Sequence, residues 1–188
     1  MTKLMIVVGS VRPGRIGLPI AQWVREHAES VGGFEIDFAD LAEINLPFMD
    51  EPKSPVKRQY TKPHTIAWSE RVDAAEAIIF VTPEYNHSLS PVLKNAIDFL
   101  YQEWWRKAVG IISYGGVSGG TRAAVALGVV VGTVGMVDTG ANLEIPFASK
   151  QVVDGAFVAT DRETGVLDRM LAELAPLATA LAPIRSRG

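Results

Sequence analysis

The sequence predicts an α/β fold, in which a doubly wound, five-stranded parallel sheet lies between two layers of helices (three-layer α/β/α). Short β-branched apolar runs alternate along the chain with longer segments whose apolar residues recur at helical spacing. The 188 residues are 48% hydrophobic and 21% charged, which is typical of one globular domain over residues 1–188. Ligands of such sheets bind beyond the carboxyl ends of the strands, where the strand order reverses. The loops at that edge are therefore the candidate functional loops.

The first third of the chain predicts two strands, a helix and a long loop. Residues 3–9 (KLMIVVG) form an apolar run typical of a strand that is buried on both faces. Residues 17–31 repeat apolar side chains at helical spacing until a Gly-Gly pair ends the pattern. Residues 34–40 (FEIDFAD) alternate between apolar and polar, which predicts a strand nearer the edge of the sheet. The proline-rich residues 41–63 predict a surface loop that is either packed or acts as a lid.

The rest of the chain continues the alternation of strand and helix. Ser90 and Pro91 suit the N-cap and the first position of a helix, and Pro176 is expected to kink the last helix. The predicted strands cover residues 77–82, 108–113 and 136–142, and the predicted helices cover residues 64–75, 90–105, 121–131 and 162–184.

Composition excludes several classes of function. The formal net charge of −3 gives no basic field for nucleic acid or anionic lipid, so the expected partner is a small molecule. The absence of cysteine excludes disulfides, thiolate metal sites and iron–sulfur clusters. The longest uncharged apolar run, residues 123–137, is shorter than the roughly 20 residues of a membrane span, and the first residues lack the pattern of a secretory signal. We therefore expect a cytoplasmic protein without nucleic-acid or membrane partners and, since the histidines lack a second ligand at a recognised spacing, without a metal.

The loop after the first strand, residues 9–17 (GSVRPGRIG), has the composition of a phosphate site. Its glycines let backbone N–H groups approach an anion, and the N-terminus of the next helix favours negative charge. Arg12 and Arg15 add charge-assisted donors, and Ser10 adds a hydroxyl. The loop has no GxGxxG pattern, and Arg15 and Ile16 replace the Lys and the Ser or Thr of a P-loop, which disfavours ATP. A glycine-rich turn with solvated arginines is the alternative.

Two further loops follow strands predicted to be central. Residues 83–88 (PEYNHS) place an aromatic ring beside an amide, a pair that can frame a flat heterocycle by stacking and hydrogen bonding. A capped turn is the alternative for this loop. Residues 113–122 (SYGGVSGGTR) contain four glycines in six positions, so backbone N–H groups can approach the edge of a ring where reduction places negative charge.

Taken in order, GSVRPGR, PEYNHS followed by LKNAID, and YGGVSGGTRA resemble the NADPH-dependent FMN reductase family of flavodoxin-like proteins. The resemblance runs from Met1 to about Asn142, and PEYN followed by LKNAID is its most specific part. It implies a flavodoxin-like fold, bound FMN, and NADPH or NADH as the reductant. It also implies that Ser10, Arg12 and the backbone near residues 15–17 hold the FMN phosphate. Many family members place a Ser or Asn at the end of this loop, where this chain has the sequence RIG.

The second and third loops are implied by the same resemblance to surround the isoalloxazine ring. The candidate cofactor-binding residues of the three loops are Gly9, Ser10, Arg12, Arg15, Ile16, Gly17, Pro83, Glu84, Tyr85, Asn86, Ser113, Gly115 and Gly116.

The resemblance implies an oxidoreductase that passes electrons from NAD(P)H through FMN to a small acceptor such as free flavin or a quinone. The flavin itself carries this chemistry, so we predict no catalytic side chain. Two alternatives need similar loops: a non-enzymatic FMN carrier or redox sensor, and a phosphate-binding module without flavin. Residues 90–105 carry more apolar surface than one core-facing stripe requires, which together with the resemblance predicts a homodimer or homotetramer.

Overall fold

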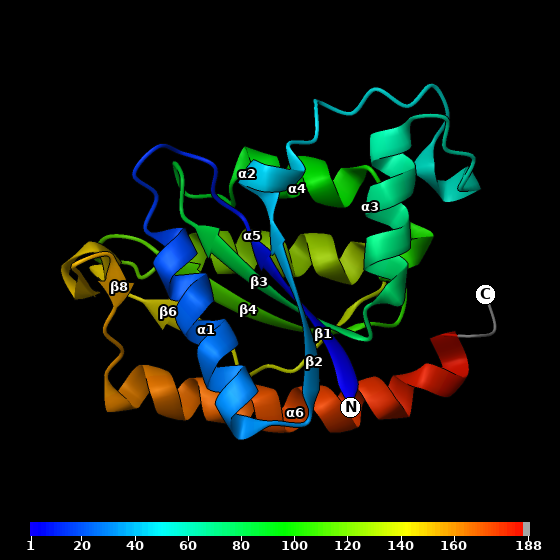
Figure 1. The fold of residues 1–188 in the computed structure, drawn as a ribbon. Coiled ribbons are helices and arrows are strands. Elements are labelled where there is room, and N and C mark those ends of the chain that lie inside the picture. The colour runs from blue at the N-terminus through cyan, green and yellow to red at the C-terminus, as the bar shows by residue number, and fades with distance from the viewer. Residues whose placement is uncertain (186–188) are drawn as a thin grey trace.

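The computed structural model describes residues 1–185, and its central feature is a parallel sheet with strand order β2-β1-β3-β4-β5 (Figure 1). A sixth strand, β6, pairs with β4 beyond the end of β5. The strands of this sheet are β1 (Thr2–Val8), β2 (Phe34–Asp40), β3 (Ala77–Pro83), β4 (Ala108–Tyr114), β5 (Val137–Asp138) and β6 (Leu143–Ile145). The helices are α1 (Gly17–Val31), α2 (Leu41–Ile44), α3 (Pro63–Ala74), α4 (Pro91–Asp98), α5 (Thr121–Thr133) and α6 (Asp161–Arg185), with 3-10 turns η1 (Pro55–Lys57), η2 (Gln102–Trp104) and η3 (Ala148–Gln151). This order confirms the predicted doubly wound sheet.

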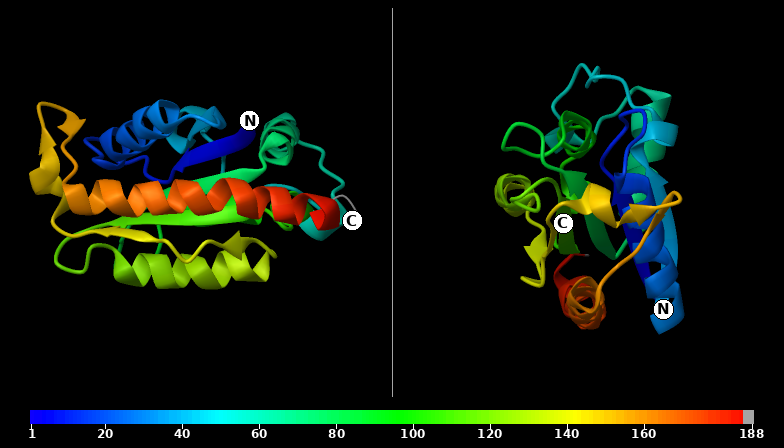
Figure 2. Two further views of the ribbon diagram at one scale, coloured as in Figure 1. Left: turned by 90° about the horizontal axis from the view of Figure 1, so that it is seen from below. Right: turned by 90° about the vertical axis from the view of Figure 1, so that its left-hand side faces the viewer.

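Helices cover both faces of the sheet, which confirms the three-layer prediction (Figures 1 and 2). Alternate residues of β1 divide between two cores, because successive side chains of a strand point to opposite faces. Leu4 and Ile6 pack with α1 and α6, whereas Met5 and Val7 pack with α3, α4 and α5. All four side chains are fully buried, as expected for a central parallel strand. No helix within residues 1–185 has the length and apolar character needed to cross a membrane.

The strand predicted over residues 136–142 is wrong in its length, because only Val137 and Asp138 form a strand there (β5) and the next strand, β6, begins beyond it at Leu143. Thr139 still donates its N–H to the carbonyl of Val109 on β4 (3.0 Å), but the chain then leaves the ladder. The side-chain oxygen of Asn142 takes over, accepting the N–H of Ile111 at 2.9 Å. A side chain therefore replaces one main-chain acceptor, and β6 resumes the pairing.

The helix predicted over residues 90–105 is also wrong in its length, because α4 ends at Asp98 and η2 follows it. Its start is confirmed, since the Ser90 hydroxyl accepts the N–H of Leu93 at 3.1 Å. The change of direction after α4 buries Trp104 completely, whereas 39% of Trp105 is exposed. Most of the apolar surface that suggested an oligomer therefore lies in the chain's own core.

The long connection over residues 41–63 contains α2 and η1, and hydrogen bonds hold it against α4 and the start of α3. The Asn95 side chain on α4 donates to the carbonyl of Pro47 (2.7 Å) and accepts the N–H of Met49 (3.0 Å). The Glu51 carboxylate accepts the N–H groups of Thr61 and Lys62 just before α3. After β6 the chain forms η3 and a short hairpin of β7 (Val152–Val153) and β8 (Ala156–Phe157), and α6 continues beyond Pro176 to Arg185.

Candidate functional site

The three predicted loops meet beyond the carboxyl ends of β1, β3 and β4, where they enclose a cavity of about 310 Å³. Its lining comprises Ser10, Arg12, Arg15, Ile16, Pro83, Glu84, Tyr85, Tyr114, Gly115, Gly116, Phe147 and Ser149. The sequence predicted most of these residues. Gly9, Gly17, Asn86 and Ser113 were also predicted but are not part of the lining.

Two of these four residues are glycines at points where the backbone packs closely. A Cβ on Gly9 would lie 2.9 Å from the carbonyl oxygen of Val81, which already accepts the Gly9 N–H at 2.8 Å. A Cβ on Gly17 would lie 2.2 Å from the hydroxyl oxygen of Tyr114. Both glycines therefore bring the first loop against the neighbouring strands, which lets it approach the cavity.

The other two residues shape the second and third loops. Asn86 has a φ of 49° and forms the tip of a tight turn in which Tyr85 and Ser88 exchange main-chain hydrogen bonds of 2.9 and 3.0 Å. Ser113 is fully buried, and its hydroxyl donates to the carbonyl of Gly119 at 3.3 Å. Ser113 therefore holds the third loop through its side chain, Asn86 shapes the second loop through its backbone, and neither residue lines the cavity.

One end of the cavity carries donors suited to an anion. The N-cap of α1 is Ile16, whose side chain cannot cap, so the first N–H groups of the helix have no side-chain acceptor. Arg12 lines this end, is exposed, and forms no ion pair with a described residue. The hydroxyl of Ser10, a residue only 2% exposed, lies 3.3 Å from the Tyr85 hydroxyl and joins the first loop to the second.

Arg15 differs from Arg12 because its charge is already balanced. Its two terminal nitrogens each lie 2.5 Å from an oxygen of Asp40, and Nη1 also donates to the Ser10 carbonyl at 2.6 Å. The hydrogen bond with Asp40 raises the pKa of Arg15. Burial opposes ionisation of Asp40, but the bonds from Arg15 and from the Ala42 N–H outweigh it and lower the pKa of that carboxyl. Arg15 therefore fixes the loop to the end of β2.

Tyr114, the last residue of β4, contributes a hydroxyl that sequence reasoning did not include. The side chain is 4% exposed, and its hydroxyl has no hydrogen bond of ordinary geometry with a described residue, although the Ser10 hydroxyl is near enough to act on its pKa. Burial raises the pKa of Tyr114, so the group is a neutral donor at ordinary pH. A buried hydroxyl without a partner is costly, and it lines the cavity beside the Arg12 end. Its place at the carboxyl end of a central strand was the available sequence signal.

Glu84, at the opposite side of the lining, is held by the start of α5. Its carboxylate accepts the Arg122 main-chain N–H at 3.0 Å and the Arg122 side chain at 2.8 Å. Burial alone would raise the pKa of Glu84, but these bonds outweigh it and lower the pKa. The carboxylate is therefore an ionised helix cap with no free proton to transfer.

Phe147 and Ser149 also line the cavity, and sequence reasoning missed them. Both follow β6, whose pairing with β4 brings them to the glycine-rich loop. Phe147 has a φ of 50° and donates its N–H to the Gly116 carbonyl at 2.9 Å, while its side chain remains 47% exposed. An added Cβ on Gly116 would meet no atom within 4 Å, so this wall of the cavity is open. No local motif predicts these contacts, because they depend on the interrupted fifth strand.

Several acidic side chains near the predicted loops are paired with a histidine or a lysine. Within residues 1–185, no three His, Asp or Glu residues gather as a metal site would require. His64 lies 2.9 Å from Asp50, and Lys94 lies 2.6 Å from Asp98.

A sequence profile of the NADPH-dependent FMN reductase family matches residues 2–150. The chain belongs to this family. Over 124 residues it is 40% identical to an NAD(P)H-dependent FMN reductase of Schizosaccharomyces pombe, a match that covers 65% of this chain and 62% of that protein. An NAD(P)H:quinone oxidoreductase of Solanum tuberosum is 31% identical over 126 residues, covering 64% and 62%. These matches span less than two thirds of the relatives' own lengths.

Solved structures share the fold of this FMN reductase family member. The flavoenzyme NAD(P)H:(acceptor) oxidoreductase FerB of Paracoccus denitrificans superposes with a TM-score of 0.77 at 21% identity, over 94% of this chain and 98% of that one. The two-electron reduced flavodoxin of Megasphaera elsdenii gives a TM-score of 0.58 at 13% identity, over 90% and 98%. The predicted flavodoxin-like fold is confirmed.

The family match also extends the region that the loop motifs indicated. The resemblance predicted from the motifs ended near Asn142, whereas the family profile reaches residue 150. It therefore includes Phe147 and Ser149, the two lining residues that follow β6.

Proposed function

We propose that this member of the FMN reductase family binds FMN in the cavity and passes electrons from NAD(P)H to a small acceptor, free flavin or a quinone. The main observation behind this proposal is that three groups able to donate hydrogen bonds, each without an acceptor among the described residues, gather at one end of the cavity. They are the Arg12 guanidinium, the buried Tyr114 hydroxyl and the first N–H groups of α1, which no side chain caps. A phosphate group provides acceptors for all three. The names of the relatives, FMN reductase and quinone oxidoreductase, support the same class of reaction.

In this proposal the phosphate end uses a small set of donors. Arg12 supplies the charge, Ser10 and Tyr114 supply hydroxyls, and the first N–H groups of α1 add the positive end of the helix dipole. Arg15 acts through its bond to the Ser10 carbonyl, which positions the loop while its own charge is balanced by Asp40.

The other end of the cavity has walls that suit a flat ring. Gly115 and Gly116 present backbone without side chains, and Tyr85 and Phe147 add aromatic rings to the lining, with the Lys150 amine 5.0 Å above the centre of the Phe147 ring. Phe147 is 47% exposed, so its side chain is open to solvent as well as to the cavity. A carboxylate at Glu84 that is already bound to Arg122 leaves the ring environment without a proton donor from this residue.

When bound, FMN supplies the two-electron chemistry, and the residues of this chain supply position and surroundings. The third loop, residues 113–122, would hold the edge of the ring on which reduction develops negative charge, through N–H groups that are not already bonded within the chain, because the Gly115 N–H is taken by the Ile145 carbonyl at 3.3 Å. Tyr114 stays protonated, since burial raises its pKa, and donates a hydrogen bond without transferring its proton.

The decisive experiment mixes purified, FMN-loaded protein with NADPH or NADH without oxygen and follows the absorbance of oxidised flavin. The proposal predicts bleaching by at least one nicotinamide and recovery when a quinone or free flavin is added. Bound FMN that resists both nicotinamides would identify an electron carrier or sensor. A protein that does not bind FMN would overturn the proposal.

A homodimer or homotetramer remains part of the proposal, on surfaces other than the segment after α4. Phe48 in the 41–63 connection is 85% exposed, and Val125 and Val129 lie one helical turn apart on α5 with 65% and 69% exposed. Exposed apolar groups of this size favour contacts between copies. Sedimentation of the FMN-loaded protein tests this, and a strictly monomeric species would contradict it.

A further inference from the structure

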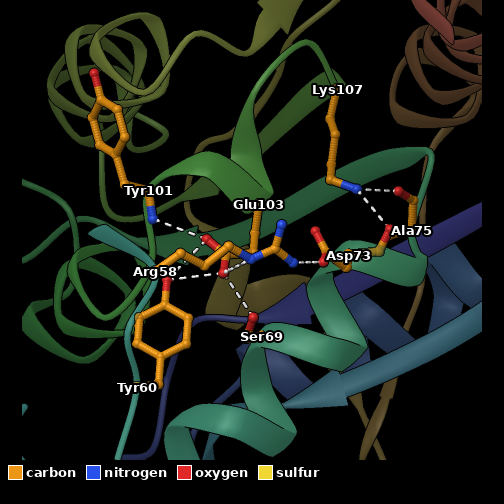
Figure 3. Close-up of polar contacts among 8 residues, drawn as sticks. All are labelled: Arg58, Tyr60, Ser69, Asp73, Ala75, Tyr101, Glu103 and Lys107. Atoms are coloured by element: carbon orange, nitrogen blue, oxygen red, sulfur yellow. Dashed lines mark hydrogen bonds and ion pairs between the residues drawn. The ribbon is translucent and has the colours of Figure 1, made fainter. Parts of the chain in front are cut away.

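A second and larger cavity, of about 620 Å³, lies at the amino ends of β3 and β4, whereas the proposed flavin site lies at their carboxyl ends. Figure 3 shows several of the residues that line it. Its lining residues lie just after η1, near the end of α3, in and beside η2, just before β4 and at the end of α6. They are Arg58, Asp73, Tyr101, Gln102, Glu103, Trp105, Lys107, Ala182 and Arg185. The lining combines charged groups with the apolar surfaces of Trp105 and Ala182. This combination is typical of sites for small organic molecules.

Of the two carboxylates of this cavity, Glu103 is fully engaged by neighbouring groups, whereas Asp73, with 40% of its side chain exposed, pairs with Arg58 through one oxygen. Glu103 is 1% exposed and accepts the hydroxyls of Tyr60 (2.8 and 3.0 Å) and Ser69 (2.7 Å), as well as a main-chain N–H. Arg58 lies between the two acids, with its Nε 3.2 Å from Glu103 and its terminal nitrogen paired with Asp73 (Figure 3). Glu103 therefore has little remaining capacity to bind a cation, and Arg58 balances the charge of Asp73.

The other two basic residues of the lining, Lys107 and Arg185, have N–H groups that lack an acceptor among the described residues. Lys107 is 2% exposed, and its Nζ donates to the main-chain carbonyls of Asp73 (3.1 Å) and Ala75, which leaves one N–H of the charged form without a described acceptor. Arg185 donates to the Glu76 carbonyl at 3.1 Å and lies 3.8 Å from its carboxylate, so most of its five N–H groups have no acceptor among residues 1–185. An excess of donors over acceptors favours an anionic ligand.

We propose that this cavity binds a small organic acid, whose carboxylate is held by Lys107 and Arg185 and whose apolar body lies toward Trp105 and Ala182. The site is independent of FMN, because it shares no lining residue with the proposed flavin cavity. The competing interpretation is purely structural: Lys107 would only bind the carbonyls at the end of α3 and tie that helix to β4.

If an organic acid binds beside Lys107, binding should be accompanied by proton uptake, which a lysine with a purely structural role would not show. Burial and the nearby arginines lower the pKa of Lys107 to about 7, so at pH 8 the amine is mostly neutral. A bound carboxylate favours the charged form, and the amine therefore takes up a proton on binding. The charged groups around Lys107 from the packed elements are Arg58, Asp73, Glu76, Glu103 and Arg185.

The test uses benzoate as the probe and benzamide as its uncharged match, measured by titration calorimetry on the full chain at pH 8. Two buffers with different ionisation enthalpies report proton uptake. We expect benzoate to bind at least about tenfold more tightly than benzamide, with net uptake of protons. Equal binding of the two probes, or no heat with millimolar benzoate, would overturn the proposal.

Substitutions at Arg185 and Lys107 distinguish a role in ligand binding from a purely structural role. Arg185→Gln should weaken benzoate binding about tenfold, whereas Arg169→Gln, on the exposed part of the same helix, should leave it unchanged. Lys107→Met should abolish proton uptake. If Arg185→Gln binds benzoate as the parent does, or if Lys107→Met still takes up protons, the proposed ligand groups are wrong. All measurements compare FMN-free with FMN-loaded protein, so failure of the flavin proposal does not affect the result.

Discussion

At the scale of single residues, the proposed FMN site depends on groups that the folded chain leaves without partners. Arg12 and the Tyr114 hydroxyl line one end of the cavity without a described ion-pair or hydrogen-bond partner, respectively. Arg15 lies in the same loop but is fully bound to Asp40 and to the Ser10 carbonyl. Substitutions at these positions should therefore separate effects on FMN affinity from effects on stability.

Tyr114→Phe removes only the hydroxyl. We expect FMN affinity to fall about five- to tenfold, because one hydrogen bond to the phosphate is worth about 1 kcal/mol. The FMN-free protein should be as stable as the parent or slightly more stable, since an unsatisfied buried hydroxyl has been removed. Fluorescence titration of FMN and thermal unfolding measure the two effects. Tyr101→Phe, outside this cavity, is the control, and unchanged affinity in Tyr114→Phe would exclude the contact.

Arg12→Ala should mainly change FMN affinity, whereas Arg15→Ala should mainly change the stability of the FMN-free protein. Arg12→Ala is expected to lower FMN affinity about tenfold or more with little loss of stability, because its side chain is exposed and unpaired. Arg15→Ala leaves Asp40, 2% exposed, without its partner and should destabilise the FMN-free protein by about 3 kcal/mol. Urea unfolding and FMN titration of both variants test this. Loss of stability in Arg12→Ala, or none in Arg15→Ala, would reverse the assignment.

At the scale of elements, the buried parallel strands were predictable and the last strand was not. Strands β1, β3 and β4 consist mainly of buried apolar residues, so their composition alone predicted both the strand conformation and the central place in the sheet. The break between β5 and β6 depends on one side chain, Asn142, which bonds a residue of β4 far from it in sequence. The same long-range pairing brings Phe147 to the cavity, which explains why local motifs predicted the three loops but missed this wall.

Asn142→Ala tests that element directly. The Ile111 N–H would lose its acceptor inside the sheet, so we expect a loss of about 1–3 kcal/mol and faster hydrogen exchange at that amide. Asp138→Ala is the control, because it removes the exposed partner of the Asn142 amide nitrogen but leaves the bond to β4. Equal losses in the two variants would show that the exposed turn matters more than the bond to β4.

At the scale of the whole molecule, two cavities lie at opposite ends of one sheet, and ionisable groups near them make the stability of the fold depend on pH. On the acid side, Asp40 and Glu84 have lowered pKa values, so their contribution to stability is lost as the pH falls through the carboxyl range. On the alkaline side, burial raises the pKa of Tyr60 and Tyr114, so the unfolded chain loses their protons first, and stability falls above about pH 10. Between these limits Lys107 is the main buried group that changes charge.

The pKa of Lys107 is lowered from 10.5 to about 7, so between these values the unfolded chain binds more protons than the folded chain. The free energy of unfolding should therefore rise from pH 7 to pH 9, with a slope of at most about 1.4 kcal/mol per pH unit. Urea unfolding at both pH values, for the parent and for Lys107→Met, measures this. The variant should lose the rise while keeping the behaviour at acid pH, because its carboxylates are unchanged. A rise of equal size in Lys107→Met would place the titrating group elsewhere, and a flat parent curve would mean that Lys107 keeps its proton in the folded chain.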